Sequence, residues 1–266
     1  MRVLVTGSSG FVGGELAKSL RVAGHEVVGV DPRPGPQTTR RGRASVECAG
    51  ESYEVVFHLG GAIDVSTCEK DPVAAWEGNV VESVRLAQGT KAERAFVFTS
   101  TVAALKPGFN AYGQTKAQAL WCLLRMNLPL AVVTLPNTYG VQGSGVVSRL
   151  LFEKEPVIYG TGEQMREFAY IEDVVRLLSE VGLGAKTGLH PMSGERTSIN
   201  RIVRLLGRQK EVRRLPPRAF ELEDPPSATV ERRHRTSLKD GIRKTVAEAD
   251  ALGMTHYAKL ENGGGK

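Results

Sequence analysis

A glycine-rich turn near the start of the chain constrains its fold more than any other feature. A short apolar strand begins almost at Met1, breaks at Gly7 and is followed by a helix. Gly10 would let the backbone approach a ligand closely, and Gly13 would let the helix lie tight on the sheet. The N–H groups at the N-terminus of this helix favour a pyrophosphate. An ordinary strand–helix turn is the alternative, but the strand before it, the helix after it and the chain's start together favour a dinucleotide site.

The next predicted strand, Glu26–Asp31, ends in an acid that bears on the choice of cofactor. An acid at this distance from the glycine turn can accept hydrogen bonds from the adenosine ribose hydroxyls. It would also repel a 2′-phosphate, which favours NAD over NADP. Arg33 argues the other way, because an arginine here can hold that phosphate. A turn acid before Pro32 is the plain structural alternative for Asp31, and we favour the ribose role.

Two further strands are predicted to end in small or hydroxyl-bearing residues. Residues 55–62 form an apolar strand with small residues at its end, which leaves room for a cofactor. His58 within it is expected to be a hydrogen-bonded core histidine rather than a ligand or a base. Residues 95–98 form the other strand, which Thr99–Thr101 close. Hydroxyls at this end of a strand face the ligand crevice, and simple capping of the strand is the alternative for Thr99.

Tyr112 and Lys116 carry the strongest chemical signal in the chain. They are four residues apart on a helix predicted to run from Ala111 to about Met126, so they share one face. An ammonium beside a phenol lowers the pKa of the phenol, which could then act as an acid or base near neutral pH. Such a pair is common by itself. Behind a glycine turn and a strand end with hydroxyls, it favours catalysis.

The composition agrees with an intracellular α/β protein. The chain has 266 residues, a formal net charge of +6 and three widely spaced cysteines without metal-ligand spacing. This length suits one α/β unit with a smaller lobe. We expect reduced cytosolic thiols, no metal, no signal peptide before Val3 and a cytoplasmic location. The longest apolar run, residues 128–135, is too short to cross a bilayer, so no membrane partner is expected.

Arginine pairs at 40–41, 213–214 and 232–233 raise the question of nucleic-acid binding. A solvated basic surface explains them more simply, so we expect no nucleic-acid partner. An intermediate possibility is that some of these arginines meet an anionic nucleotide substrate.

The remaining elements are predicted from periodicity and capping signals, with Ser198 as a helix cap and Gly263–Gly265 as a flexible tail. Further strands are expected at 44–48, 131–135 and 189–192, and further helices at 72–88, 173–181, 199–206 and 238–252. A cofactor-binding domain is expected over 1–140 with about 168–205. A small substrate-binding lobe is expected over about 141–167 and 206–260.

Residues 1–205, with a fainter echo at Gly241–Val246, resemble the extended short-chain dehydrogenase/reductase family. Within it, they resemble the NAD-dependent epimerase/dehydratase group, which acts on nucleotide sugars. The motifs that carry this resemblance are Gly7–Gly13, His58–Gly61, Thr101, Tyr112 with Lys116, Pro136–Gly140 and Gly160–Asp173. The resemblance implies a Rossmann α/β fold with a doubly wound parallel sheet and NAD as the cofactor.

The resemblance also implies roles for individual residues. Thr101, Tyr112 and Lys116 would be catalytic, Lys116 would also hold the nicotinamide ribose, and Asn79 would lie behind the active site. Asn137 and Arg166 would bind a nucleotide-sugar substrate with Thr101, Arg166 through a phosphate. The expected cofactor-binding residues are Gly7, Ser9, Gly10, Phe11, Val12, Gly13, Asp31, Arg33, Leu59, Gly60, Gly61, Asn79, Thr99, Tyr112, Lys116 and Pro136.

Departures from the family pattern bear on the substrate. The segment between Asp31 and Val55 is short, the loop from Thr101 to Tyr112 is short, and the usual C-terminal segment is missing, so the substrate lobe is reduced. Dehydratases of the family carry Asp-Glu after the catalytic Thr, and decarboxylases a Glu. Val102 and Ala103 stand there instead, which favours an epimerase, or simple oxidation–reduction, over dehydration. Of these we expect a 4-epimerase acting through a transient keto sugar.

Two alternatives to an epimerase stay open. The first is a reductase or dehydrogenase of a keto sugar or small carbonyl compound. The second is a redox-inactive NAD-binding module, which the trimmed lobe favours and the intact Thr101, Tyr112 and Lys116 disfavour. The resemblance further implies a homodimer in which helices near 72–88 and 111–126 pair as a four-helix bundle. The expected seam includes Ala75, Ala117, Leu120 and Leu124.

Overall fold

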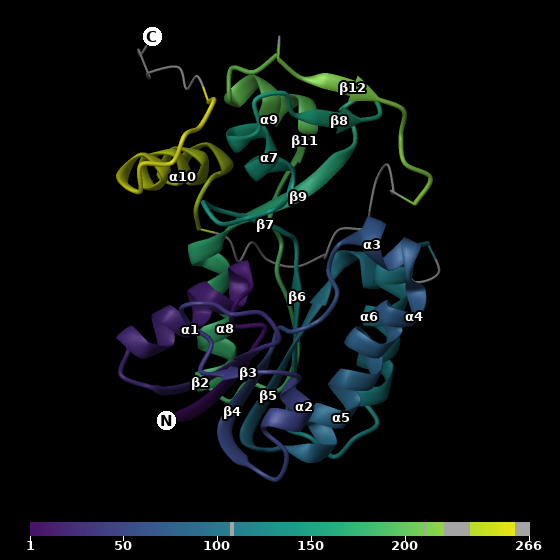
Figure 1. Ribbon diagram of the computed structural model, residues 1–266, viewed down its shortest axis with the longest axis vertical. Coiled ribbons are helices and arrows are strands. Elements are labelled where there is room, and N and C mark those ends of the chain that lie inside the picture. Colours follow the sequence, from purple (N-terminus) through teal and green to yellow (C-terminus); the bar gives the residue numbers. More distant parts are fainter. Residues whose placement is uncertain (107–108, 210, 221–234, 259–266) are drawn as a thin grey trace. The chain divides into compact units, whose positions relative to one another are not determined.

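The structure is a computed structural model that describes residues 1–106, 109–209, 211–220 and 235–258 (Figure 1). It divides into two compact units. The first is Met1–Leu135 with Val174–Met192, and the second is Pro136–Asp173 with Ser193–Lys266. Residues 136–140, 168–173 and 193–205, which the sequence analysis assigned to the cofactor domain, therefore belong to the second unit. The physical reason is that their strands pair with one another in a separate sheet.

The first unit is built on a parallel sheet of seven strands in the order β10-β6-β5-β4-β1-β2-β3. All of its strand pairs are parallel, and the order reverses between β1 and β4. The strands are β1 (Arg2–Thr6), β2 (Glu26–Asp31), β3 (Arg40–Arg41), β4 (Ser52–His58), β5 (Lys91–Thr101), β6 (Leu130–Leu135) and β10 (Gly188–Pro191). This arrangement confirms the expected doubly wound α/β fold.

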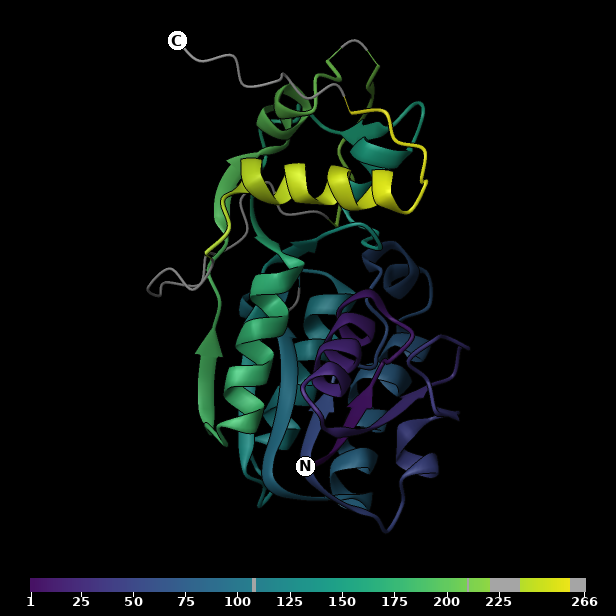
Figure 2. The same ribbon diagram turned by 90° about the vertical axis from the view of Figure 1, so that its left-hand side faces the viewer.

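Helices cover both faces of this sheet because its strands are apolar on both sides. On one face lie α1 (Phe11–Val22) and the first-unit part of α8 (Ile171–Leu183), which face the viewer in Figure 2. On the other lie α2 (Ala44–Glu47), α5 (Glu82–Gly89) and α6 (Ala111–Leu123), with α3 (Val65–Lys70) and α4 (Pro72–Trp76) beside them (Figure 1). The core on this second face packs β-strand aromatics, Phe96 and Phe98, against Leu123 of α6, and all three are fully buried.

Several predicted elements are confirmed and others differ. The predicted Glu26–Asp31 strand is β2, and Ser198 caps α9 (Ile199–Leu205) by accepting a hydrogen bond from Arg201 N–H at 3.3 Å. The strand predicted over 44–48 is wrong: these residues form the short helix α2, which packs against α5. The predicted 72–88 helix exists but contains a π-helical segment, Glu77–Val81. The helix α3 had no counterpart in the prediction.

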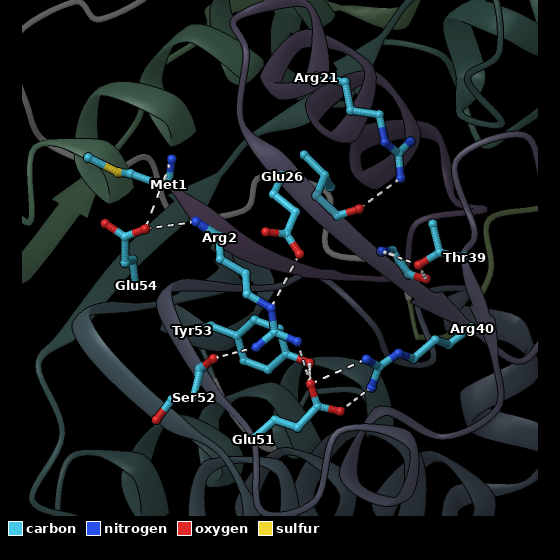
Figure 3. A network of polar contacts seen from close by, with 12 residues as sticks. Met1, Arg2, Arg21, Glu26, Thr39, Arg40, Glu51, Ser52, Tyr53 and Glu54 are labelled. Atoms are coloured by element: carbon cyan, nitrogen blue, oxygen red, sulfur yellow. Dashed lines mark hydrogen bonds and ion pairs between the residues drawn. The ribbon is translucent and has the colours of Figure 1, made fainter.

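A polar network ties β1, β2, β4 and the loop before β3 together at one side of the sheet (Figure 3). The carboxylate of Glu51 accepts hydrogen bonds from Arg2, at 2.5 Å, from Arg40 and from the Tyr53 hydroxyl, at 3.0 Å. The two guanidinium groups lower the pKa of Glu51 to about 2. Glu51 therefore stays ionised through the physiological range. The network joins β1, the short strand β3 and the start of β4.

The described residues of the second unit form two small sheets and, besides the start of α8, the helices α7 (Val146–Phe152), α9 and α10 (Leu238–Ala251). Its three-stranded sheet has β9 (Met165–Tyr170) in the middle, antiparallel to β11 (Glu195–Ser198) and parallel to β7 (Asn137–Tyr139). The other sheet pairs β8 (Val157–Tyr159) with β12 (Arg213–Leu215). The predicted helix 238–252 is therefore confirmed as α10.

Two buried charged side chains organise the second unit. The carboxylate of Asp173 accepts hydrogen bonds at 2.8 Å from the N–H groups of Arg235 and Thr236, just before α10. The fully buried guanidinium of Arg208 donates to the carbonyl of Leu150, in α7. Each charge satisfies backbone groups that would otherwise be unpaired.

Two sequence features lie outside the described residues, namely the arginine pair at 232–233 and the glycine tail at 263–265. Among the helices that the structure describes, none is long and apolar enough to span a membrane. No cluster of His, Cys, Asp and Glu side chains suited to a metal ion occurs within the described ranges.

Candidate functional site

A cavity of about 780 Å³ lies in the first unit at the carboxyl ends of β1, β2 and β4. Their final residues, Thr6, Asp31 and His58, all line it. The strand order reverses here, and open α/β sheets bind ligands at such a point. The volume falls within the roughly 300–1,000 Å³ of small-molecule sites. The predicted cofactor residues that line it are Gly7, Gly10, Asp31, Arg33, Leu59, Gly60 and Gly61.

The glycine turn is packed too closely for side chains at two of its positions. Gly7 has φ +73°, and a Cβ there would lie 2.9 Å from the Gly60 nitrogen. A Cβ on Gly13 would lie 2.2 Å from the Gly7 carbonyl oxygen, which confirms that Gly13 lets helix and turn pack closely. Gly10 is the N-cap of α1 and makes no side-chain cap hydrogen bond. Phe11 and Val12 follow in the first turn, so their N–H groups point out of the helix end toward a ligand.

Asp31 is buried, at 3% exposure, and organises the loop after β2. Its carboxylate accepts hydrogen bonds from Ser9 N–H at 3.1 Å and from Arg33 N–H at 2.9 Å. It also forms an ion pair with the Arg33 guanidinium at 3.3 Å. The hydroxyl of Ser9 donates to the Arg33 carbonyl at 2.7 Å. In this arrangement Arg33 is paired with the acid, which weakens it as a partner for a 2′-phosphate.

Thr101 and Tyr112 meet in the first unit although they come from different elements. Thr101 ends β5 and caps the 3₁₀ turn Val102–Leu105, and Tyr112 lies in the first turn of α6. The Thr101 side chain lies close enough to the Tyr112 phenol to lower its pKa. Burial outweighs this effect and raises the pKa of the Tyr112 phenol to about 12.

Lys116 lies one turn further along α6 and is buried at 6% exposure. Its Nζ lies 4.2 Å from the centre of the Phe98 ring, on the strand that ends at Thr101. Burial lowers the pKa of Lys116 to about 7. The expected lowering of the Tyr112 pKa by this ammonium is not found, because burial penalises both charges and dominates each shift. Tyr112 and Lys116 do share one face of one helix, as their spacing predicted.

The start of α6 is held in place by three contacts. The Asn110 side chain accepts a hydrogen bond from Gly113 N–H at 2.7 Å, which caps the helix. The Glu69 carboxylate, from α3, accepts one from Ala111 N–H at 2.5 Å. A Cβ on Gly113 would lie 2.6 Å from the Ala103 carbonyl oxygen, so only glycine allows the helix to lie this close to the 3₁₀ turn. The sequence analysis identified none of these supports.

Asn79 lies on the π-helical segment and links two parts of the site. Its side chain pairs with both backbone groups of Ala62, at 2.8 and 3.0 Å, and donates to the Thr115 hydroxyl at 2.9 Å. A Cβ on Gly61 would lie 2.4 Å from the Asn79 Oδ1. Interruptions of this kind in helices are frequent at functional sites. The Thr99 hydroxyl donates to the His58 carbonyl at 3.2 Å, so Thr99 closes the strand end as well as lying near the site.

His58 is a core residue, as predicted. It is 1% exposed, and both ring nitrogens have partners at 2.8 Å, the hydroxyls of Thr6 and Ser83. Burial, with a smaller contribution from Lys116, lowers the pKa of His58 to about 3. The imidazole is therefore neutral, which excludes it as a general acid at neutral pH.

The remaining candidates, Pro136, Asn137 and Arg166, belong to the second unit. Pro136 is buried, whereas Asn137 is exposed and donates to the Glu167 carbonyl at 3.0 Å. Asn137 and Arg166 line a second cavity of about 160 Å³ together with Arg149 and Arg218. Three guanidinium groups around one small cavity suit an anionic ligand. Arg149 and Arg218 were missed, because neither belongs to a recognisable sequence motif.

Comparison with known proteins agrees with this geometry. The model of the NAD dependent epimerase/dehydratase family matches residues 3–190. A UDP-glucose 4-epimerase from Mycolicibacterium smegmatis is 26% identical over 92% of this chain and 97% of its own length. A UDP-N-acetyl-alpha-D-glucosaminuronate decarboxylase from Bacillus cytotoxicus is 26% identical over 65% of this chain and 68% of its own length. The structure of MoeE5 in complex with UDP-glucose and NAD has a TM-score of 0.80 at 25% identity, covering 95% of this chain and 99% of that one.

Proposed function

The chain belongs to the NAD dependent epimerase/dehydratase family and is NAD-dependent, and we propose that it is a nucleotide-sugar 4-epimerase. The observation that carries the proposal is the proximity of the Thr101 side chain to the Tyr112 phenol, with buried Lys116 one turn away. Hydroxyl, phenol and amine together can bind, deprotonate and reprotonate one carbinol oxygen. An inert NAD-binding module would not need such a set.

The first cavity fits NAD by its glycine turn, its acid at the end of β2 and its volume. Gly7, Gly10 and the first turn of α1 would hold the pyrophosphate, and Asp31 the adenosine ribose. NAD, when bound, accepts a hydride from a carbinol carbon and returns it. Lys116 would hold the nicotinamide ribose.

The chain's own groups would manage the substrate oxygen. Tyr112 would take the proton from the sugar hydroxyl through its phenol oxygen and later return it. Thr101 would donate a hydrogen bond to the same oxygen and stabilise its developing negative charge. Between the two steps the keto sugar would rotate in the site, so that the hydride returns to its other face. The configuration at that carbon would then be inverted.

The residues after Thr101 support epimerisation over elimination or decarboxylation. Both of those reactions need a further acid or base at the substrate, and Val102 and Ala103 supply none. The relatives include a decarboxylase as well as a 4-epimerase, so this local difference decides our choice.

The arginine-lined cavity of the second unit supports a nucleoside diphosphate as the part of the substrate that stays bonded to the sugar. Arg149, Arg166 and Arg218 all line it, and Asn137 adds an amide. Guanidinium groups bind phosphate oxygens in bidentate fashion. We propose that Arg166 contacts a phosphate and that Asn137 contacts the nucleotide sugar.

One experiment tests the proposed function. The protein is incubated with a panel of nucleotide sugars, with and without added NAD. The sugar carried by each nucleotide is then identified. We expect the 4-epimer of at least one substrate and no net change in NADH. A stoichiometric redox product would favour the reductase alternative, and no product with any substrate would favour the inert module.

A further inference from the structure

A buried chain of hydrogen bonds runs through the first unit from the wall of the cofactor cavity to the π-helical segment. Gly60 N–H donates to the Thr6 hydroxyl at 2.9 Å, and that hydroxyl lies 2.8 Å from His58 Nδ1. On the other side of the ring, His58 Nε2 lies 2.8 Å from the Ser83 hydroxyl. Ser83 donates in turn to the Asn79 carbonyl at 2.5 Å. The four side chains, Thr6, His58, Asn79 and Ser83, are each at most 2% exposed.

The Asn79 carbonyl, at the far end of this hydrogen-bond path, fixes which group donates in every hydrogen bond along it. A carbonyl can only accept, so the single Ser83 proton is used on Asn79. The Ser83 oxygen must then accept from His58, which places a proton on Nε2. A neutral ring with Nε2–H has a bare Nδ1, so the Thr6 hydroxyl donates to it. Burial keeps the ring neutral, with a pKa of about 3.

The chain continues from Asn79 to the helix that carries Tyr112 and Lys116. The Asn79 side chain binds the backbone of Ala62 and donates to the Thr115 hydroxyl. Thr115 donates to the Tyr112 carbonyl at 3.0 Å. One continuous polar path therefore joins Gly60 at the cavity wall to the first turn of α6.

We propose that His58 is a positioning residue, held as the Nε2–H tautomer, that fixes the cofactor-binding segment Gly60–Ala62 relative to α6. His58 lines the cavity, but in this role it acts through Thr6 on one side and through Ser83 and Asn79 on the other. Reversal of the tautomer would set two acceptors against each other at Ser83 and two donors at Thr6. The path would then break on both sides of the ring.

The first test is spectroscopic. Nitrogen-15 and proton NMR of histidine-labelled protein reports which ring nitrogen carries the proton, and the His58 signals are assigned by their loss in His58→Asn. We expect a protonated Nε2 and a bare Nδ1 throughout about pH 5 to 8. An Nδ1–H tautomer, or titration of His58 in that range, would overturn the proposal.

The second test measures NAD affinity without any sugar, so it is independent of the proposed epimerase activity. His58→Gln keeps an amide near the Nε2 position and removes the Thr6 link, and Ser83→Ala removes the other link. Each should weaken NAD binding by about tenfold, because the cofactor-binding segment Gly60–Ala62 would no longer be held in place. Neither side chain needs to contact NAD for this effect.

Val80→Ala is the matched control. Val80 is buried on the same segment, at 4% exposure, but has no place in the polar path. It should lower the melting temperature and leave the NAD affinity within about twofold of wild type. If His58→Gln does not fold, Ser83→Ala alone decides the outcome. Variants that lose thermal stability but keep wild-type NAD affinity, as Val80→Ala should, would reduce His58 to an ordinary core residue and contradict the proposal.

Discussion

Lys116 is a buried amine whose charge costs free energy in the folded protein. Burial lowers its pKa from 10.5 to about 7. Between these values the unfolded chain holds one more proton than the folded chain, so the free energy of unfolding rises with pH. Below about pH 7 both states are protonated and the folded state carries the full cost of the buried ammonium.

We therefore predict a difference in pH dependence between wild type and Lys116→Met. From pH 7 to pH 10, wild type should gain stability relative to the variant, by up to about 1.4 kcal/mol per pH unit. Urea unfolding at several pH values measures this directly. Parallel curves for the two proteins would mean that the Lys116 pKa is not lowered.

Asp31 determines the choice between NAD and NADP in our account, because it would bind the ribose and it pairs with Arg33. Asp31→Ser should weaken NAD binding and release Arg33, so the ratio of NAD to NADP affinity should fall by at least about tenfold. Arg33→Ala is the control and should leave NAD binding nearly unchanged. Titration of both cofactors measures the ratio. Tighter binding of NADP by wild type would contradict the role of Asp31.

At the residue scale, the sequence spacing of the site residues was predictable, whereas their pKa values and ion pairs were not. The glycine turn, the acid at Asp31 and the shared face of Tyr112 and Lys116 follow from local periodicity. The pKa values follow from burial, which depends on long-range packing around Phe98 and β5. The ion pair of Arg33 with Asp31 was likewise not predicted. The sequence analysis took Asp31 as favouring NAD and Arg33 as favouring NADP, and the two side chains pair with each other.

The α6 helix depends on its close approach to the turn Val102–Leu105. Because a Cβ on Gly113 would lie 2.6 Å from the Ala103 carbonyl, Gly113→Ala should displace Tyr112 from Thr101. We predict a fall in turnover of at least about tenfold, the cost of a misplaced catalytic group. Gly89→Ala, at the end of α5 with no contact nearer than 3.8 Å, should leave turnover unchanged. Equal rates for both variants would show that this approach is unimportant.

The elements with strong periodicity were predictable, and the short ones were not. The helix α1 and the strands β2 and β6 carry clear patterns and end at capping or turn residues. Residues 44–47 are too few for periodicity to separate a helix from a strand, and their packing against α5 decides for a helix. The residues on both sides of the π-helical segment keep a helical sequence pattern. The one additional residue in its turn could therefore not be recognised from the sequence.

At the scale of the whole molecule, we propose a homodimer through α4 and α6. Exposed apolar side chains on these helices include Trp76, Trp121 and Leu124, at 42, 51 and 58% exposure. Ala75, expected on or near the seam, is 2% exposed, so it would lie behind the contacting side chains. Exposed apolar side chains on two helices that pack together suit a second copy of the chain.

Light scattering at micromolar concentration tests the dimer. Wild type should have twice the monomer mass, and Leu124→Glu should have the monomer mass because a carboxylate would be buried at the seam. Val22→Glu, an exposed apolar residue on α1 at 84% exposure, should stay dimeric. A monomeric wild type would exclude this arrangement.

The central claim is that Tyr112 moves the substrate proton at an NAD-dependent site. The most direct measurement is the initial rate of 4-epimerisation, together with the NAD affinity, for wild type and Tyr112→Phe on the nucleotide sugar that the panel identifies. The account predicts a loss of about two to four orders of magnitude in rate, with NAD affinity preserved, because phenylalanine keeps the ring and removes only the phenol oxygen. A Tyr112→Phe variant with a near-wild-type rate would contradict it.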